Sequence, residues 1–293
     1  MGKVVGLGEI LWDIFPNQKV LGGAPANFAY HISQFGLDGY VVSAVGQDSL
    51  GKEILDNLTE KGLHYLIETT PFPTGSVDVF LDNKGIPQYQ INENVAWDNI
   101  PFSEKTKNLA KNTTTVCFGS LAQRHQNSRE TIHLFLDTMP KDSLKIFDIN
   151  LRLHYFSPEI IENSLEKANI LKINDEEVVK VAKLFDWKGS ERTICEKLAS
   201  LFHLDFLILT KGTAGSLILS PNHESFLPTP KVNVVDTVGA GDSFTAAFVA
   251  SHLKGYSLEE AHQLAVEVSA YVCGQHGAMP KLAEHHLQSF RKS

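Results

Sequence analysis

Short runs of hydrophobic residues alternate along this chain with longer segments whose hydrophobic residues follow the spacing of a helix face. The short runs predict buried strands, and they lie at 4–9, 40–45, 113–119, 144–148, 168–173, 205–210 and 216–219. The longer segments predict helices, among them one ending near residue 35, one over 127–138, and two at 240–253 and 257–274. This alternation indicates a single domain over 1–293, a three-layer α/β/α, Rossmann-like fold with a mostly parallel sheet.

One segment breaks the alternation. From Gly75 to Asn92 hydrophobic and polar residues alternate with a period of two, and Asp-Asn-Lys-Gly at 82–85 stands in the middle. This pattern predicts a β-hairpin with a tight turn. We expect it to lie outside the main sheet, as part of a small β lid formed by segments near 10–20 and 75–98.

The stretch Asp-Thr-Val-Gly-Ala-Gly-Asp-Ser-Phe at 236–244 follows a β-branched run at 232–235 and precedes a small-residue apolar segment. It therefore predicts a strand, a tight loop and a buried helix. Gly239 and Gly241, on either side of Ala240, leave backbone N–H groups uncovered. The helix start adds unpaired donors and the positive end of the helix dipole, so the loop is a candidate anion cradle for a phosphoryl group.

Asp242 stands at the edge of this cradle. Its carboxylate is a candidate general base for a hydroxyl group that attacks the phosphorus held there. The structural alternative is that Asp242 or Asp236 caps the helix, and that the glycines only shape a turn.

Polar residues also follow the first strand, at the strand end where ligands of α/β sheets bind. Asp13 lies in an apolar setting, where a carboxylate needs partners such as hydroxyl groups; an Asx-turn ahead of Pro16 is the alternative. Gly22 and Gly23 let the backbone approach a small ligand, and Asn27 offers a donor and an acceptor on the first turn of a helix.

Two more segments carry candidate chemistry. Arg152, in the loop Asp-Ile-Asn-Leu-Arg at 148–152, can bind ligand oxygens or stabilise a transition state, or can pair with Asp148 instead. Asn174 is a natural N-cap, and Glu177 in the same first turn suits the helix dipole without any chemical role.

Two nucleotide-binding patterns are incomplete. Residues 46–52 match Gly-x-x-x-x-Gly-Lys, but Glu53 replaces the Ser or Thr that would bind Mg²⁺, and its charge would repel a phosphate. Gly6-Leu7-Gly8 is not followed by the rest of the dinucleotide fingerprint, which argues against an oxidoreductase.

Composition narrows the class of protein. The 293 residues are 43% hydrophobic and 20% charged, which is typical of a globular protein. A net charge of −8 without a basic stripe argues against nucleic acid as a partner. No apolar run approaches the roughly 18–20 residues that cross a bilayer, and the N-terminus lacks a signal-peptide pattern, so we expect a cytoplasmic protein with no membrane partner. Cys117, Cys195 and Cys273 are expected to be free buried thiols.

The string at 236–244 closely resembles the C-terminal motif of the ribokinase-like (PfkB) carbohydrate kinases. Asp13 with residues 22–27 resembles the family's N-terminal sugar-binding motif, and residues 45–51 resemble its Val-Gly-x-Asp-x-x-Gly stretch. Residues 148–152 resemble the Asp-Pro-Asn-x-Arg of fructokinases and 2-keto-3-deoxygluconate kinases, with Ile149 where Pro is usual. These motifs follow the family order over nearly the whole chain.

The resemblance implies an ATP- and Mg²⁺-dependent kinase that phosphorylates a primary hydroxyl of a small sugar, most like a fructokinase. It implies catalytic roles for Asp242, Arg152 and the amides of Gly239, Ala240 and Gly241. The substrate-binding residues are expected to be Asp13, Gly22, Gly23, Asn27, Arg152 and Asp242. The ATP-binding residues are expected to be Asn174, Thr210, Lys211, Gly212, Gly215, Gly239 and Gly241. Trp97 can stack on a sugar face or make a hydrophobic contact at the lid.

For metal ions, the Asn-x-x-Glu spacing resembles the motif these kinases use near magnesium, which makes Glu177 the candidate Mg²⁺ residue through water. A site for a monovalent cation such as K⁺ is implied at Asp236, Val238, Val272, Gln275 and Gly277. Lys281 stands where ribokinase has a small hydroxyl residue.

The sequence leaves other interpretations of the function open. The acceptor could be 2-keto-3-deoxygluconate, ribose or a nucleoside, and a catalytically silent sugar or nucleotide sensor could use the same scaffold. Lid hairpins in relatives often pair between subunits, so a homodimer through the lid is expected.

Overall fold

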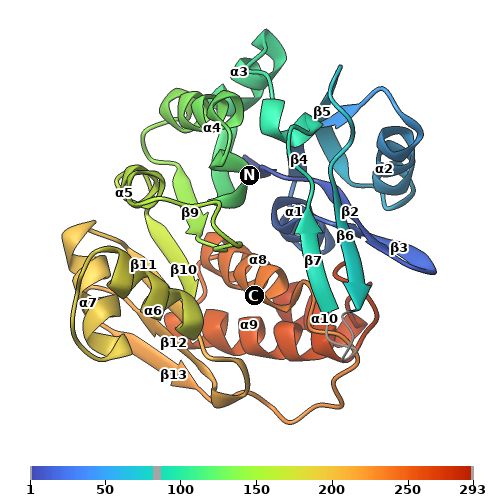
Figure 1. Ribbon diagram of the computed structural model, residues 1–293. Helices are drawn as coiled ribbons and strands as arrows, with labels where there is room; N and C mark the ends of the chain where they lie inside the picture. Colours follow the sequence, from blue (N-terminus) through green and yellow to red (C-terminus); the bar gives the residue numbers. More distant parts are fainter. Residues whose placement is uncertain (1, 82–86, 292–293) are drawn as a thin grey trace.

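The computed structural model describes residues 2–81 and 87–291, and it is built around a nine-stranded sheet in the order β13-β12-β11-β10-β9-β8-β1-β4-β5 (Figure 1). Its strands are β1 (Lys3–Leu7), β4 (Gly39–Gly46), β5 (His64–Thr70), β8 (Thr113–Gly119), β9 (Leu144–Asp148), β10 (Ile170–Asn174), β11 (Phe206–Thr210), β12 (Ser216–Leu219) and β13 (Glu224–Leu227). Neighbouring strands pair in parallel except at β12, which is antiparallel to β11 and β13. The mostly parallel sheet is thus confirmed.

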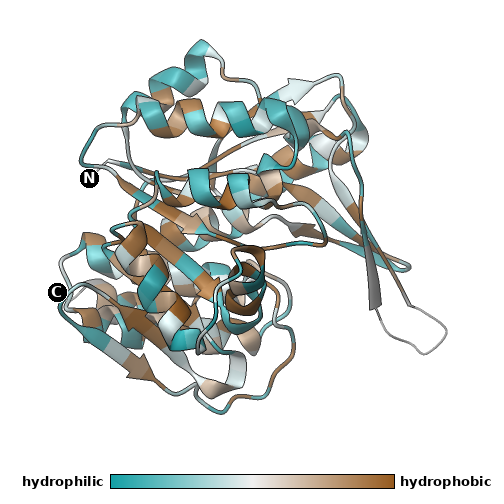
Figure 2. Cartoon of the chain, turned by 60° about the vertical axis from the view of Figure 1, so that its left-hand side comes forward, coloured by the Kyte–Doolittle hydropathy of each residue, from teal (hydrophilic) through white to brown (hydrophobic). Residues whose placement is uncertain are grey.

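Helices cover both faces of this sheet. One face carries α1 (Ala24–Gln34), α2 (Ser49–Glu60), α8 (Ala240–Leu253), α9 (Leu258–Cys273) and α10 (Glu284–Arg291). The other carries α3 (Glu104–Lys111), α4 (Gln126–Thr138), α5 (Pro158–Leu165), α6 (Asp175–Leu184) and α7 (Glu191–Leu201). Successive strand residues point to opposite faces, so Ile208 packs in one hydrophobic cluster while Leu207 and Leu209 pack in the other. Figure 2 shows the hydrophobic strands between the more hydrophilic helices.

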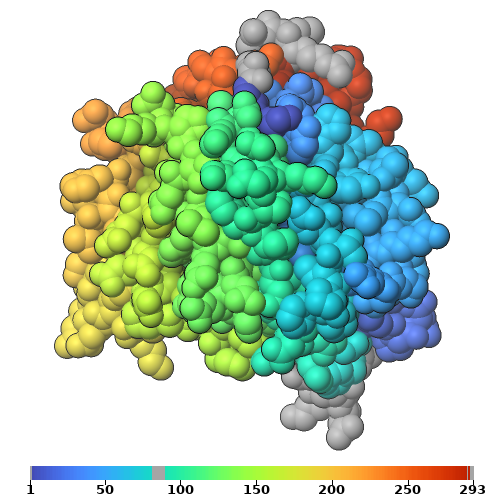
Figure 3. Space-filling model, turned by 90° about the horizontal axis from the view of Figure 1, so that it is seen from above, coloured from blue at the N-terminus to red at the C-terminus, as the bar shows by residue number. Residues whose placement is uncertain are grey.

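The order of the strands is also visible at the surface. In Figure 3 the yellow residues near 200, the green residues near 130 and the blue residues near 50 follow one another across the molecule. β1, the first strand, lies in the interior of the sheet between β4 and β8. The chain therefore builds first to one side of β1 and later to the other, and the carboxyl end of β1 is a topological switch point where ligands bind.

A second sheet stands beside the carboxyl end of the main one. It has four strands in the order β3-β2-β6-β7, which are β2 (Leu11–Phe15), β3 (Gln18–Gly22), β6 (Ser76–Leu81) and β7 (Pro87–Ile91). β6 and β7 are antiparallel, which confirms the hairpin, while its expected turn at 82–85 lies outside the described residues. β2 joins β6 in parallel, so the two expected lid segments form one sheet.

The strand expected at 232–235 is wrong. The segment between β13 and α8 forms no strand, and Val232, Val234 and Val235 are at least 40% exposed. β-branched residues favour a strand only where they pack on a pleated surface. Here the chain crosses from β13 to α8 along the outside, and the Val235 N–H bonds the Cys273 carbonyl of α9 instead of a neighbouring strand.

The base of the lid sheet is fixed by Arg124, a buried residue that follows β8. Its guanidinium donates to both carboxylate oxygens of Asp98, at 2.7 and 2.8 Å, and to the Asn92 carbonyl at 2.6 Å. Its carbon Cζ lies 4.1 Å from the ring centre of Trp97 and 4.6 Å from that of Tyr155. The guanidinium thus joins the end of β7 to the main sheet.

Trp97 is completely buried beneath this guanidinium. Stacking of Trp97 on a sugar face does not fit that position, and the alternative, a hydrophobic contact at the lid, does. The physical reason is that the lid segment returns into the core, where the indole packs against Gly75.

The buried pair gives a prediction about stability. Asp98→Ala should lower the free energy of unfolding by about 3–5 kcal/mol, because it leaves the Arg124 charge buried without its carboxylate. Urea denaturation measures the change, and Asp137→Ala, which removes a partly exposed pair with Lys167, should cost less than about 1 kcal/mol. Equal costs for the two variants would contradict this account.

Candidate active site

The start of α8 has the geometry of the expected anion cradle. Gly239 is the residue before the helix and has φ 77°, and a Cβ atom there would lie 2.7 Å from the backbone of Ala278. Only glycine fits such a position without strain. The amide of Ala240 already donates to the Thr237 carbonyl at 3.3 Å, and that of Ser243 donates to the Gly239 carbonyl at 2.8 Å. The cradle is therefore formed by backbone geometry.

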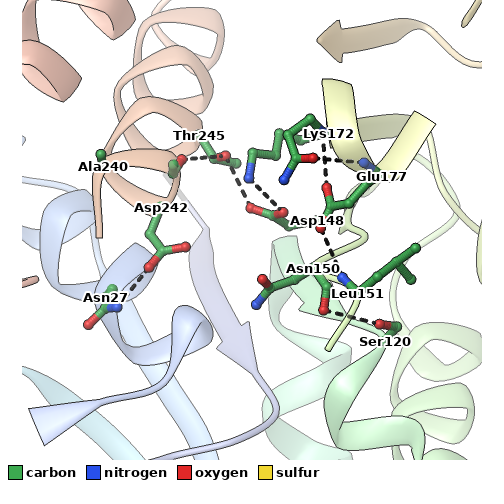
Figure 4. A network of polar contacts seen from close by, with 12 residues as sticks. Asn27, Ser120, Asp148, Asn150, Leu151, Lys172, Glu177, Ala240, Asp242 and Thr245 are labelled. Atoms are coloured by element: carbon green, nitrogen blue, oxygen red, sulfur yellow. Dashed lines mark hydrogen bonds and ion pairs between the residues drawn. The ribbon is translucent and has the colours of Figure 1, made fainter. Parts of the chain in front are cut away.

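Asp242, in that first turn, meets Asn27 from α1. The Asn27 side-chain Nδ2 donates to Asp242 Oδ2 at 2.7 Å, although the two residues are 215 positions apart. Figure 4 shows Asp242 reaching down from α8 to Asn27, with Asp148 and Lys172 on its other side. The Asn27 Oδ1 atom is buried and has no hydrogen-bond partner among the described residues, so it is an available acceptor beside the carboxylate. The structure thus brings together residues from both ends of the chain.

The environment of Asp242 makes its carboxylate more basic. Burial, followed by the negative charge of Asp148, raises the pKa of Asp242 to about 6. The Asn27 hydrogen bond and the positive charges of Lys172 and Arg152 oppose this increase. A base with a pKa near the working pH is suited to accept a proton from a hydroxyl group.

Lys172 is a site residue that the sequence analysis missed. It is 8% exposed, and its Nζ lies 3.0 Å from Asp148 Oδ1. Burial lowers the pKa of Lys172, but the carboxylates of Asp148, Glu177 and Asp242 raise it above the usual value, so the ammonium stays charged. A Cβ atom at Gly241 would lie 2.9 Å from this Nζ, which puts a fixed positive charge directly under the cradle. The available signal was a lysine inside the apolar run Ile-Leu-Lys-Ile at 170–173.

The pairing of Lys172 with Asp148 answers an open question about Arg152. Within the described residues no ion pair joins Arg152 to Asp148, whose carboxylate pairs with Lys172. Arg152 is exposed, and its charge lowers the pKa values of Asp13 and Asp242. Its guanidinium therefore faces the cleft between the lid and α8.

The lid side of the cleft is shaped by Asp13 and two glycines. A Cβ atom at Gly22 would lie 2.7 Å from Asp13 Oδ2, and one at Gly23, where φ is 116°, would lie 2.4 Å from the Glu9 carbonyl. Burial raises the pKa of Asp13 to about 6, with Arg152 lowering it and Asp236 raising it further. The glycines are therefore needed to let the Asp13 carboxylate and the first turn of α1 come close together.

Glu177 fastens the loop that carries Arg152. Its Oε1 accepts the Leu151 N–H and its Oε2 the Asn174 N–H, both at 2.9 Å, while Asn174 caps α6. Both oxygens of Glu177 therefore accept a backbone N–H, and its role near Mg²⁺ stays a prediction. No cluster of three His, Cys, Asp or Glu side chains able to hold a metal ion is found in residues 2–81 and 87–291.

The loop after β11 holds the remaining ATP candidates. Thr210 ends the strand, and Gly212 and Gly215 have φ angles of 51° and 117°. The Lys211 ammonium lies 2.7 Å from the Glu191 carboxylate, so this side chain forms a partly exposed ion pair in the ligand-free chain. These residues lie at the same edge of the sheet as Asn174, because β10 and β11 are parallel neighbours.

The candidate loops for a monovalent cation are tied together by Asp236. Its Oδ1 accepts the Val238 N–H at 3.0 Å and its Oδ2 accepts the Gly277 N–H at 3.1 Å. Val272 ends up on the buried face of α9, and its carbonyl accepts the Gln275 N–H. The five residues are therefore brought together at the C-terminal side of the cradle.

The loop at 46–53 has no free cradle. The Asp48 carboxylate accepts the N–H groups of Gly51 and Thr74 and the Thr74 hydroxyl. A carboxylate already occupies the position that a phosphate would need, which agrees with the sequence argument from Glu53.

Comparison with known proteins identifies the family. Residues 14–285 match the model of the pfkB family carbohydrate kinases. The chain belongs to this family. It is therefore a phosphotransferase whose acceptor is an alcohol group of a sugar, and the resemblance of the motifs from Asp13 to Gly277 is confirmed at the level of the family.

The pfkB kinases that resemble it include proteins with different names. A sugar kinase of Pyrococcus horikoshii named PH1459 is 27% identical over 100% of this chain and 96% of its own. Its crystal structure in complex with ATP has a TM-score of 0.83, covering 97% of this chain and 98% of that one. An ATP-dependent 6-phosphofructokinase of Thermoanaerobacterium thermosaccharolyticum is 28% identical (96% and 91%), and probable fructokinase-5 of Arabidopsis thaliana is 29% identical (95% and 94%).

These comparisons agree with the three-layer fold and with ATP as the phosphoryl donor. Within the described part of the chain, no helix has both the length and the apolar character needed to span a bilayer.

The raised pKa of Asp242 gives a prediction about this pfkB kinase in the absence of ligands. A carboxyl group whose pKa is higher in the folded than in the unfolded protein supports stability fully below about pH 4, and that support is lost as the pH rises through about 6. Asp242→Asn should therefore be more stable than the wild type at pH 8, by about 1–2 kcal/mol after discounting for the partly open cleft.

Urea denaturation at several pH values measures this difference, which should vanish near pH 4. Asp137→Asn, at an exposed position, is the matched control and should show no such trend. A constant difference between Asp242→Asn and the wild type across this range would rule out the raised pKa.

Proposed function

We propose that this kinase transfers the γ-phosphoryl group of ATP to a primary hydroxyl of a small uncharged sugar, with fructose as the favoured acceptor. The observation that carries the proposal is the Asp242 carboxylate, held by Asn27 at the start of α8 with its pKa raised to about 6. The name of the Arabidopsis relative, a probable fructokinase, supports fructose.

In this mechanism the cleft orients the sugar between the lid and α8. Asp13, Arg152 and the free Oδ1 of Asn27 supply acceptors and donors for its hydroxyl groups. The reacting hydroxyl lies at Asp242, which takes its proton as the oxygen attacks the γ-phosphorus. The first-turn amides of α8 and the buried Lys172 ammonium stabilise the charge that develops on the transferred group.

The nucleotide would lie across the carboxyl ends of β10 and β11. Asn174, Thr210, Gly212 and Gly215 place polar groups and exposed backbone along this edge, and Lys211 would leave Glu191 to meet a phosphate. Mg²⁺ bound with ATP supplies positive charge to the phosphates, and Glu177 would contact it through water. A monovalent cation such as K⁺ would be held by the loops that Asp236 joins.

The charges around the lid favour an uncharged sugar over a sugar phosphate. Asp13 lies on β2 and Glu93 follows β7, where it accepts a hydrogen bond from the Tyr155 hydroxyl. Two nearby cations are already paired, Lys19 with Glu53 and Arg124 with Asp98. A phosphate group already present on the sugar would therefore meet the carboxylates of Asp13 and Glu93. Pairing of two lids into a homodimer and a cytoplasmic location remain predictions.

The charge argument is tested by acceptor specificity. We expect kcat/KM for fructose to exceed that for fructose 6-phosphate by about 100-fold or more, which corresponds to about 2.7 kcal/mol. A coupled assay of ADP formation with fructose, fructose 6-phosphate, ribose, 2-keto-3-deoxygluconate and adenosine measures it. A preference for fructose 6-phosphate would refute the uncharged acceptor, and no ADP formation with any sugar would favour a catalytically silent sensor.

The role of Asp242 is tested separately. Asp242→Asn should lower kcat by about 10²–10⁴-fold, since the amide cannot accept the proton, with little change in ATP affinity. In the wild type, the acid limb of the pH profile of kcat/KM should have its midpoint near pH 6, where Asp242 loses its proton. Near-normal turnover of Asp242→Asn with a native melting curve would refute the base assignment, and Asn174→Ala, on the nucleotide side, should raise the KM for ATP instead.

A further inference from the structure

Glu9 is a buried acid that neither the sequence motifs nor the mechanism above uses. It lies between β1 and β2, where the chain leaves the main sheet and enters the lid sheet. The side chain is 3% exposed, and its Oε2 atom has no hydrogen-bond partner within the described residues. Burying a carboxylate oxygen without a hydrogen-bond partner costs free energy, so the groups around Glu9 indicate its role.

A small cavity lies against this side chain. Its volume is about 10 Å³, and Glu9, Cys117, Asp148 and Asp242 line it together with residues at the start of α1. That volume is about the minimum that holds one water molecule, which also needs two to four polar partners. Three of the residues that line it carry carboxyl groups, Glu9, Asp148 and Asp242, and Glu9 has a carboxylate oxygen without a partner within the described residues.

The charges that face Glu9 come from every element around the cavity. Asp242 of α8, Asp148 of β9 and Cys117 of β8 line the cavity together with Glu9. Arg152 of the loop after β9 and the Ala24 N–H of α1 also act on Glu9, while Lys172 of β10 acts on Cys117. Lys172 already neutralises Asp148, whereas Asp242 has a neutral hydrogen-bond donor, Asn27. Glu9 and Asp242 are thus two carboxyl groups on one cavity, and ionisation of one opposes ionisation of the other.

The pKa values of both carboxyl groups are raised, as this opposition requires. Burial, and after it the charge of Asp242, raises the pKa of Glu9 to about 7, while its own amide, Arg152 and the Ala24 amide lower it. The pKa of Asp242 rises only to about 6. Asp242 is the better stabilised anion of the two, because its Oδ2 accepts the Asn27 amide whereas Glu9 Oε2 has no partner within the described residues, so a proton shared by the pair favours Glu9.

We propose that Glu9 is a positioning residue for the phosphoryl transfer: as a neutral acid it holds a water molecule in the cavity beneath Asp242, and as an anion it inhibits the reaction. This inference rests on the proposed role of Asp242. A neutral carboxyl group donates its O–H to the water, which can then donate to Asp242 and hold it in place. An ionised Glu9 donates nothing and adds a negative charge close to the cradle that must accept a phosphoryl group.

The variant that separates these states is Glu9→Gln, since the amide keeps a donor at the same position and never ionises. In the wild type, kcat/KM for the accepted sugar should fall at high pH, with a midpoint at or above about 7, since the bound phosphates raise the pKa further. Glu9→Gln should keep wild-type activity at pH 6.5 within about threefold and should lose the alkaline decline, which requires Glu9 to ionise. The surface control Glu196→Gln should retain it.

Two results would overturn the proposal. One is a Glu9→Gln enzyme with an unchanged alkaline decline. The other is a natively folded Glu9→Gln enzyme that is inactive at every pH, which would mean that the reaction needs the anion. Glu9→Leu, which removes the donor, should lower kcat about tenfold at pH 6.5 with an unchanged KM for ATP, and wild-type kcat in that variant at this pH would refute the water-holding role.

A readout without catalysis keeps this test apart from that of the proposed function. Without ligands, Glu9→Gln should gain melting temperature relative to the wild type as the pH rises from 5 to 8, because a raised pKa makes ionisation of Glu9 destabilising. A pH-independent difference would show that Glu9 does not titrate as described. Failure of every sugar in the ADP assay would instead refute the proposed function, whatever the melting curves show.

Discussion

The site depends on one electrostatic constraint, which is that a carboxylate must be kept partly buried at the positive end of α8 without losing its ability to ionise. Asn27 and the helix start stabilise the anion, whereas burial and Asp148 destabilise it, and the balance leaves the pKa of Asp242 at about 6. Neither α1 nor α8 alone could set this balance. It arises because two helix N-termini, one from each end of the chain, meet over the switch point of the sheet.

Several other features follow from placing negative charge in this interior. Lys172 neutralises Asp148 and lies under Gly241, so the base of the cradle carries one fixed positive charge. Glu177 uses both carboxylate oxygens to bind the amides of Leu151 and Asn174, which fixes the Arg152 loop relative to α6. Arg124 and Asp98 hold the end of the lid in the same way. These parts of the site are thus secured by buried, hydrogen-bonded charges, while Arg152 is exposed and Lys211 is partly exposed.

Local pattern was sufficient wherever an element is stabilised by its own sequence and a buried face. The strands at 113–119, 144–148 and 216–219 and the helix at 240–253 have the bounds expected from hydrophobic spacing. The strand prediction at 232–235 was wrong because β-branched residues form a strand only beside a neighbouring strand, and Val234 faces solvent instead. The interpretation of Trp97 as a sugar-stacking residue does not fit for a related reason. Its burial depends on packing against the Arg124 guanidinium, which no local sequence pattern contains.

By itself the sequence determined the class of fold, the glycine-rich turn before α8 and the family, because glycines, caps and strand periodicity act over a few residues. Tertiary structure alone decided which charges meet. Lys172 and Glu9 look like single polar residues within apolar runs, and only the tertiary structure brings Glu9 to the small cavity that Asp242 also lines and pairs Lys172 with Asp148. Electrostatic interactions depend on distance in space and on burial, and neither quantity is set by separation along the chain.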